Sequence, residues 1–285
     1  MTSHKIARVG FLASLVALLA ACTPSPALLN VLVPRSGYHV VRDLAYGDGP
    51  RRKLDVYVPD HLAGKAPVLL FFYGGSWAFG SRDQYLAFGQ AFASLGIVTV
   101  VADYRLYPEV TYPAFVEDGA QAVAWVHAHI AEHGGDPQRL FVSGHSAGGY
   151  NAVMLGSDPK YLKAVGGDLT WMRGVIGISG AYDFLPLTGP DYIAIFHGPM
   201  NREAMPVNHI DGKRPPMLLA WGLEDGTVGH KNIDNMEGAL KRAGSPVETK
   251  RYPGTGHVGI ILSLIPGFRG RTTLRQDMAA FIQSH

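Results

Sequence analysis

Cysteine is nearly absent from this chain of 285 residues, which contains only Cys22. One thiol excludes an intramolecular disulfide, and it also excludes zinc or iron–sulfur sites that need several cysteines. The sequence has no His-Glu-x-x-His pattern either. Because both common sources of zinc ligands are missing, we expect no metal site.

An excess of charge of one sign is also missing. Lysine and arginine number 25 against 23 acidic residues, the net charge is +2, and no basic run stands out. Nucleic-acid and anionic-membrane binders carry clustered basic residues, so we expect no nucleic-acid partner. Internal repeats are absent too, and a hydrophobic content of 47% is enough to bury one large core. We therefore expect one domain.

The longest apolar run, residues 9–21, lies next to the N-terminus and follows Lys5 and Arg8. It is too short to span a bilayer, which takes about 20 apolar residues. A basic start followed by such a run is typical of a bacterial export signal. The four residues 19–22, Leu-Ala-Ala-Cys, resemble the lipobox of bacterial lipoproteins, in which the cysteine is lipidated and becomes the new N-terminus.

This resemblance implies a lipoprotein signal over residues 1–21, a tether over residues 22–37 and a membrane contact made only through a lipid on Cys22. Thr23 is not the aspartate that retains many lipoproteins at the inner membrane. The implied location is therefore the outer membrane, facing the periplasm. An ordinary cleaved signal with an accidental cysteine is the alternative.

The rest of the chain alternates predicted strands with predicted helices. Residues 38–46 and 53–58 alternate polar with apolar residues, which predicts an antiparallel pair with one wet face. Short, nearly continuous apolar runs predict buried parallel strands at 68–73, 97–102, 140–143, 175–179 and 217–221, with one more at 247–252. Helices are predicted at 84–95, 114–133, 148–155, 232–243 and 274–282.

This order predicts an α/β fold with a mostly parallel, doubly wound sheet and helices on both faces. Such sheets carry their chemistry at the carboxyl ends of the strands. Residues 183–215 form a short insertion between two strands, and we expect them to be a small cap. Four apolar side chains of the cap are candidate pocket walls: Tyr192, Ile193, Phe196 and Met200.

A nucleophile motif follows the strand at 140–143. Residues 144–148, Gly-His-Ser-Ala-Gly, fill the G-x-S-x-G pattern and lead directly into a predicted helix. In that context the serine sits on a sharp strand-to-helix turn, and the glycines let strand and helix approach closely. The motif therefore predicts Ser146 as a nucleophile.

A serine hydroxyl needs a base, and this architecture supplies its partners in the order serine, acid, histidine. His257, in a loop after the last predicted strand, is the histidine that fits this order. Asp225, in the loop after the strand at 217–221, is the preferred acid. Glu224 beside it and Asp183 after the preceding strand are the alternatives.

A glycine pair follows the strand at 68–73, where backbone N–H groups can hold a developing oxyanion. The predicted donors are the amides of Gly75, Ser76 and Ala147. Trp77 and Tyr150 flank the predicted site and are candidate substrate-binding residues.

Several motifs together resemble the carboxylesterase branch of the α/β-hydrolase superfamily over residues 38–285. They are Tyr-Gly-Gly-Ser-Trp at 73–77, Asp-Tyr-Arg-Leu at 103–106, the serine motif at 144–148, Gly-Leu-Glu-Asp at 222–225 and Gly-His at 256–257. Residues 103–162 are similar to isoprenylcysteine methylesterases, kynurenine formamidases and bacterial esterases grouped with feruloyl esterases. Relatives usually carry histidine where this chain has Tyr73, and we expect the tyrosine hydroxyl to replace it as an organiser of the loop.

The resemblance implies an α/β-hydrolase fold and a cofactor-free serine carboxylesterase acting on small-molecule esters. A small cap favours short acyl chains. An amidase, aryl-formamidase or peptidase of the same fold is the alternative within enzymes, because the same groups serve both reactions. A catalytically inactive lipoprotein that binds an acyl ligand is the alternative of another class.

Overall fold

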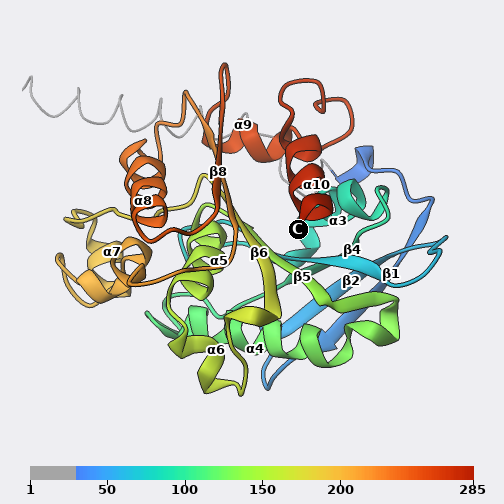
Figure 1. The fold of residues 1–285 in the computed structure, drawn as a ribbon, viewed down its shortest axis with the longest axis horizontal. Coiled ribbons are helices and arrows are strands. Elements are labelled where there is room, and N and C mark those ends of the chain that lie inside the picture. Colours follow the sequence, from blue (N-terminus) through green and yellow to red (C-terminus); the bar gives the residue numbers. More distant parts are fainter. Residues whose placement is uncertain (1–29) are drawn as a thin grey trace, which may run out of the picture.

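Eight strands form a single sheet in the computed structural model, which describes residues 30–285 (Figure 1). Their order across the sheet is β1-β2-β4-β3-β5-β6-β7-β8. The strands are β1 (Tyr38–Ala45), β2 (Lys53–Pro59), β3 (Ala66–Phe72), β4 (Val98–Ala102), β5 (Gly135–His145), β6 (Met172–Ile178), β7 (Met217–Gly222) and β8 (Val247–Tyr252). Neighbours from β4 to β8 pair in parallel, and β2 is antiparallel to β1 and β4. All eight strands predicted from the sequence are confirmed.

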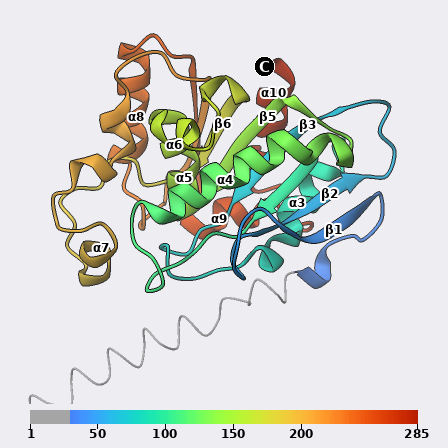
Figure 2. The ribbon, with the colours of Figure 1, turned by 90° about the horizontal axis from the view of Figure 1, so that it is seen from below.

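Helices cover both faces of the sheet (Figures 1 and 2). The helices α3 (Leu86–Ala93) and α10 (Leu274–Ser284) lie on one face, where Arg275 Nε donates to the Ala91 carbonyl at 2.8 Å. On the other face lie α4 (Ala114–His129) and α5 (Ala147–Ser157), with α6 (Lys160–Ala164) beside α4. The helix α8 (Lys231–Arg242) packs against β7 and β8. This is the doubly wound α/β-hydrolase fold that the sequence predicts.

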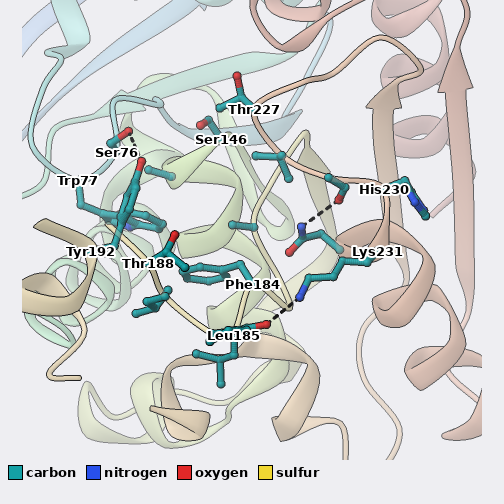
Figure 3. A pocket seen from close by; sticks show the side chains of 17 residues that line it. Ser76, Trp77, Ser146, Phe184, Leu185, Thr188, Tyr192, Thr227, His230 and Lys231 are labelled. Atoms are coloured by element: carbon teal, nitrogen blue, oxygen red, sulfur yellow. Dashed lines mark hydrogen bonds between the residues drawn. The ribbon is translucent and has the colours of Figure 1, made fainter. Parts of the chain in front are cut away.

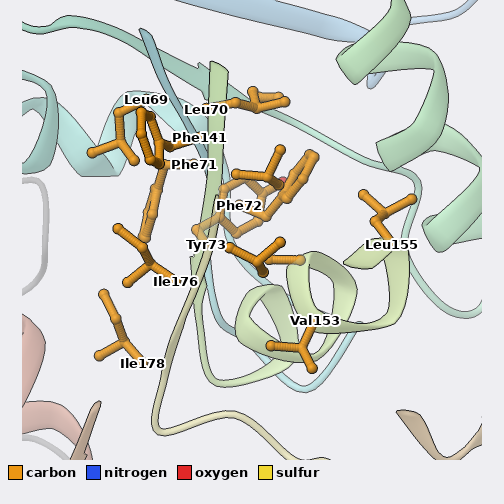
Figure 4. Close-up of a cluster of buried hydrophobic side chains, with 14 of the residues drawn as sticks. Leu69, Leu70, Phe71, Phe72, Tyr73, Phe141, Val153, Leu155, Ile176 and Ile178 are labelled. Carbon is orange, nitrogen blue, oxygen red and sulfur yellow. The ribbon is translucent and has the colours of Figure 1, made fainter. Parts of the chain in front are cut away.

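The core lies on both sides of the central strands because buried parallel strands carry apolar residues on both faces. Phe71 and Ile176 point to the α3 face, whereas Phe72 lies on the opposite face with Val153 and Leu155 of α5 (Figure 4). All five side chains are fully buried. The two apolar faces fix the register of the sheet and therefore the positions of the loops at its carboxyl edge.

Two sequence predictions need correction. The wet face predicted for the antiparallel pair is present on β1 only, since β2 is buried along six of its seven residues. The cause is its position between β1 and β4 beneath α3, where a Cβ on Gly89 would lie 2.5 Å from the Tyr57 ring. The predicted tether also ends too late, because the short 3-10 helix Asn30–Leu32 leads into Val33, whose side chain is buried in the core.

Three short helices were not predicted from the sequence: α6, α7 (Pro190–Ile195) in the cap and α9 (His257–Leu262) after the last strand. Each has only five or six residues, which is too short for an apolar periodicity to appear. The signal, Cys22 and the start of the tether lie outside the described residues. Within residues 30–285, none of the helices combines the length and the apolar character needed to cross a membrane.

We predict that Phe141→Ala lowers the free energy of unfolding by about 3–5 kcal/mol, the range for truncating a buried phenylalanine. Phe141 is fully buried and packs edge-on against Phe281 of α10. Urea unfolding measures the loss. Phe79→Ala is the matched control, since Phe79 is 72% exposed and its truncation is expected to change stability by about 0.5 kcal/mol or less. Equal losses in both variants would contradict this description of the core.

Candidate active site

Ser146 occupies a sharp turn between β5 and α5. Its φ of 55° and ψ of −121° lie in a region that residues other than glycine rarely adopt. The turn is held by the Ser146 amide, which donates to the Ile178 carbonyl at 2.9 Å. Such a backbone stores of order 1–3 kcal/mol of strain and persists only where the surroundings enforce it.

The two glycines of the serine motif are required by contact with the backbone. A Cβ on Gly144 would lie 2.1 Å from the Gly148 carbonyl oxygen, and a Cβ on Gly148 would lie 2.0 Å from the Phe72 carbonyl oxygen. No side chain fits at either position without moving a strand or the helix. The close approach of β3, β5 and α5 therefore forces Ser146 outward at the edge of the sheet.

Ser146, His257 and Asp225 form a continuous chain of hydrogen bonds. The distance from Ser146 Oγ to His257 Nε2 is 2.9 Å, and His257 Nδ1 lies 2.8 Å from Asp225 Oδ2. In the arrangement that suits proton transfer, the hydroxyl donates to Nε2, and Nδ1–H donates to the carboxylate. The structure thus brings together three residues that are up to 111 positions apart in the sequence.

Asp225 is held as a carboxylate by its neighbours. Its Oδ1 accepts the amides of Thr227 at 2.9 Å and Val228 at 2.8 Å. Burial acts to raise the pKa of Asp225, but the hydrogen bonds from His257 and these amides outweigh it and keep the pKa below its usual value. An ionised Asp225 orients the imidazole and stabilises its charged form.

The two alternative acids do not contact His257. Glu224 Oε1 accepts the Gly254 amide at 2.9 Å, and Asp183 Oδ2 accepts from Asn235 Nδ2 at 2.6 Å. Glu224 therefore braces the loop that carries the histidine. The geometry favours Asp225 as the acid.

His145 has a structural role that was not predicted from the sequence. It is buried beside the catalytic candidates, and its Nε2 lies 2.9 Å from the His257 carbonyl, to which it donates. Burial and the neighbouring His257 lower the pKa of His145 to about 3. A neutral imidazole therefore ties the serine turn to the backbone of the histidine loop.

The predicted oxyanion donors line the same cavities as Ser146. Gly75 and Ser76 have φ of 136° and 52°, and Ala147 is the first residue of α5, whose N-terminus favours negative charge. Within the part of the chain that the structure describes, the amides of these three residues donate to no backbone or side-chain acceptor. They are available to a ligand at the serine.

Tyr73, the departure from the usual histidine, is anchored below this loop. Its hydroxyl donates to Asp103 Oδ1 at 2.8 Å, and Arg51 Nη1 lies 3.3 Å from the same hydroxyl. Burial, followed by the charge of Asp103, raises the pKa of Tyr73, so the hydroxyl stays a donor. The expected replacement of histidine by a tyrosine anchor fits these contacts.

Two cavities meet at Ser146. The cap-side cavity has a volume of about 700 Å³ and runs from Ser146 past Trp77 and Tyr192 toward Phe184 and Lys231 (Figure 3). The apolar cavity, about 430 Å³, lies between α3 and α9 and is lined by His257.

Trp77 and Tyr192 therefore line the site as predicted from the sequence, but Tyr150 does not. Tyr150 is fully buried behind Trp77. Its hydroxyl donates to the Ala204 carbonyl at 2.8 Å, so that end of the ring points away from the cavity. Phe196 is buried in the same layer, and Ile193 and Met200 do not line either cavity.

Comparisons with known proteins find similarity to esterases. The family model BD-FAE matches residues 54–189. The probable isoprenylcysteine alpha-carbonyl methylesterase ICMEL1 of Arabidopsis thaliana is 29% identical over 247 residues, which cover 79% of this chain and 52% of that protein. Esterase LipC of Mycobacterium tuberculosis is 31% identical over 237 residues, covering 76% and 59%. The chain thus spans between half and two thirds of the length of these two curated relatives.

Solved structures share the fold. A truncated carbohydrate esterase from gut microbiota superposes with a TM-score of 0.76 at 19% identity, covering 88% of this chain and 98% of that one. The thermophilic esterase Est2 of the Planctomycetes species Thermogutta terrifontis, solved with propionate bound, gives a TM-score of 0.71 at 26% identity, covering 88% and 96%. The chain therefore has an α/β-hydrolase fold that carries a Ser-His-Asp constellation.

The strain at Ser146 predicts that Ser146→Gly is more stable than Ser146→Ala, by about 1 kcal/mol. Glycine adopts a positive φ freely, whereas alanine keeps the strain, and the greater unfolded-state entropy of glycine offsets part of the gain. Urea unfolding of the two variants measures the difference. An alanine variant as stable as the glycine variant would show that the turn is not strained.

Burial of a neutral His145 predicts a stability that depends on pH. Between pH 6.5 and about 3 the unfolded chain binds a proton on His145 that the folded chain does not bind. The contribution of the neutral side chain is therefore present above pH 6.5 and is lost as the pH falls toward 3. We expect the advantage of the wild type over His145→Gln to shrink by up to about 1.4 kcal/mol per pH unit in this window.

Urea unfolding at several pH values between 7 and 4 measures this trend. His39→Gln is the control, because the His39 side chain is 62% exposed. A wild-type advantage over His145→Gln that stays constant from pH 7 to 4 would contradict the assignment of a buried neutral imidazole.

Proposed function

We propose that the protein is a serine carboxylesterase that hydrolyses small-molecule carboxylic esters through an acyl-enzyme. The observation that carries this proposal is the unbroken chain of hydrogen bonds from Ser146 through His257 to Asp225 at a strained strand-to-helix turn. Similarity to proteins named as esterases, in sequence and in structure, supports esters as the substrate class.

The reaction takes two steps. Ser146 Oγ attacks the ester carbonyl carbon and passes its proton to His257 Nε2, and the amides of Gly75, Ser76 and Ala147 hold the oxyanion. The carbon–oxygen bond to the alcohol breaks as His257 returns the proton to the leaving oxygen. Water that is deprotonated by His257 then attacks the acyl-enzyme, and the acid leaves as Ser146 regains its proton.

We also propose a preference for short acyl chains. The cap-side cavity has apolar walls that include Trp77, Phe184 and Leu187, but polar groups interrupt them. These polar groups are Thr188, Lys231 and Asn232, together with the Tyr192 hydroxyl, which donates to Ser76 Oγ at 3.1 Å. Methylene groups gain free energy only where apolar surface covers them. A long acyl tail therefore gains less there than on a continuous apolar wall, and Est2 with bound propionate is a similar protein with a short acid in its structure.

The first test is hydrolysis of p-nitrophenyl esters with acyl chains of two to sixteen carbons by residues 23–285. We expect rates to peak at short chains, and we expect Ser146→Ala to lose several decades of kcat, up to about a millionfold. A variant that keeps the wild-type rate would rule out Ser146 as the nucleophile. Inactivity of both proteins on every ester would favour the amidase or the ligand-binding alternative.

A second test separates the candidate acids. Asp225→Asn is expected to lower kcat by about 10⁴, because the imidazole loses its orienting carboxylate. Glu224→Gln and Asp183→Asn, which replace the two acids without a bond to His257, are expected to stay within about tenfold of the wild type. Initial rates on p-nitrophenyl acetate measure all three. A larger loss in Glu224→Gln or Asp183→Asn than in Asp225→Asn would overturn the assignment.

We propose further that Cys22 carries a lipid and anchors the protein in the bacterial outer membrane, facing the periplasm. The support is the resemblance of residues 19–22 to a lipobox after a basic start and an apolar run. Expression of the full chain in a bacterial host, followed by mass spectrometry of the N-terminal peptide, is expected to find an acylated Cys22. Cys22→Ser is expected to move the protein out of the membrane fraction, and an unmodified Cys22 would contradict the proposal.

A further inference from the structure

We infer that the ester lies across the two cavities, with its leaving alcohol in the apolar cavity between α3 and α9 and its acyl group in the cap-side cavity. The enzyme would then select esters of apolar alcohols. This inference rests on the proposed esterase function and adds which cavity binds the alcohol half of the substrate and which binds the acyl half.

The catalytic candidates are divided between the cavities. Both cavities include Ser76, Ser146 and Thr227 in their walls. His257 lines only the apolar cavity, and Ala147, with its free amide, lines only the cap-side cavity. An ester bound at Ser146 therefore has one side facing the proton donor and another facing the helix N-terminus.

Proton transfer decides the orientation. The leaving oxygen must come within hydrogen-bond reach of His257 Nε2, since that nitrogen returns the proton as the bond breaks. The alcohol is attached to this oxygen and so begins on the His257 side, where the apolar cavity opens. The acyl group stays bonded to Ser146 and extends the other way, beneath Trp77 and Tyr192.

The composition of the apolar cavity defines the alcohol that fits. Its walls come from α3 and from α9 with the turn that follows, and they include Ala87, Phe88, Ile261, Leu262, Leu264 and Ile265. Among these described lining residues there is no lysine, arginine, aspartate or glutamate, and the buried His145 is neutral above pH 3. By contrast, His230 and Lys231 line the cap-side cavity. Alkyl and aryl alcohols therefore gain most from the apolar cavity.

The test varies the two halves of the substrate independently. One series holds acetate constant and lengthens the alcohol from methyl to hexyl, and the other holds methanol constant and lengthens the acyl group. In the first series we expect kcat/KM to rise by up to about fourfold per methylene, the fold-change that burial of one methylene implies. The second series is expected to stay flat or fall.

Matched tryptophan variants assign each cavity. Ile261→Trp fills the apolar cavity and is expected to lower kcat/KM for hexyl acetate by about tenfold or more relative to methyl acetate, without changing acyl preference. Leu187→Trp in the cap-side cavity is expected to do the reverse. Leu95→Trp is the control, because Leu95 is 38% exposed and lines neither cavity. If Ile261→Trp changes acyl preference and leaves alcohol preference alone, the assignment is reversed and the inference is wrong.

A measurement on the wild type covers the case in which a variant fails to fold. Acyl-enzyme formed from p-nitrophenyl acetate partitions between water and added alcohol, which binds where the leaving alcohol binds because the step is the reverse of acylation. We expect 1-hexanol to capture more acyl groups than methanol at equal concentration. Equal capture would overturn the inference although esterase activity stands, whereas absence of any ester hydrolysis would instead overturn the proposed function.

Discussion

The close approach of β3, β5 and α5 around Ser146 is the constraint on which the rest of the site depends. Glycines at 144 and 148 leave room for backbone where any side chain would collide with a carbonyl group. The serine between them is forced into a positive φ, and its amide is tied to β6. Because these strands form the buried centre of the sheet, the strain is held by the whole core and does not relax locally.

The loops around that turn are fixed by buried charges. Asp103 accepts the Tyr73 hydroxyl and is also paired with Arg82, which bridges to Asp55 at 2.9 Å. Asp118, fully buried in α4, pairs with Arg52 at 3.0 Å and with Arg105 at 2.7 Å. A buried carboxylate needs such partners, and removing one typically costs several kcal/mol. Through these pairs the motif at 103–106 is tied both to Tyr73, before the glycine loop, and to α4.

Sequence patterns predict the sheet, five of the helices and the three residues that form the hydrogen-bonded chain. Those features depend on local signals: apolar runs mark the strands, and a serine between glycines after a strand marks the turn. The orienting acid was less determined, because Glu224 and Asp225 are adjacent and only the path of the backbone decides which one reaches His257. Local signals do not carry that information.

Other features arise from contacts between distant segments. The hydrogen bond from His145 to the His257 carbonyl joins residues 112 positions apart, and no local sequence pattern around His145 predicts it. Tyr150 is a candidate substrate contact from the sequence because it flanks the predicted site, yet in the structure it is fully buried against Trp77. The division of the site into an apolar cavity and a cap-side cavity depends on α9 and α7, two helices too short to leave a periodic pattern.

The most direct test of the central claim is covalent labelling of the folded protein with a fluorophosphonate, read by intact mass and peptide mapping. We predict one adduct per chain on Ser146, lost in His257→Ala, because the hydroxyl reacts only when a base takes its proton. Absence of an adduct, or an adduct on another serine, would show that Ser146 is not an activated nucleophile.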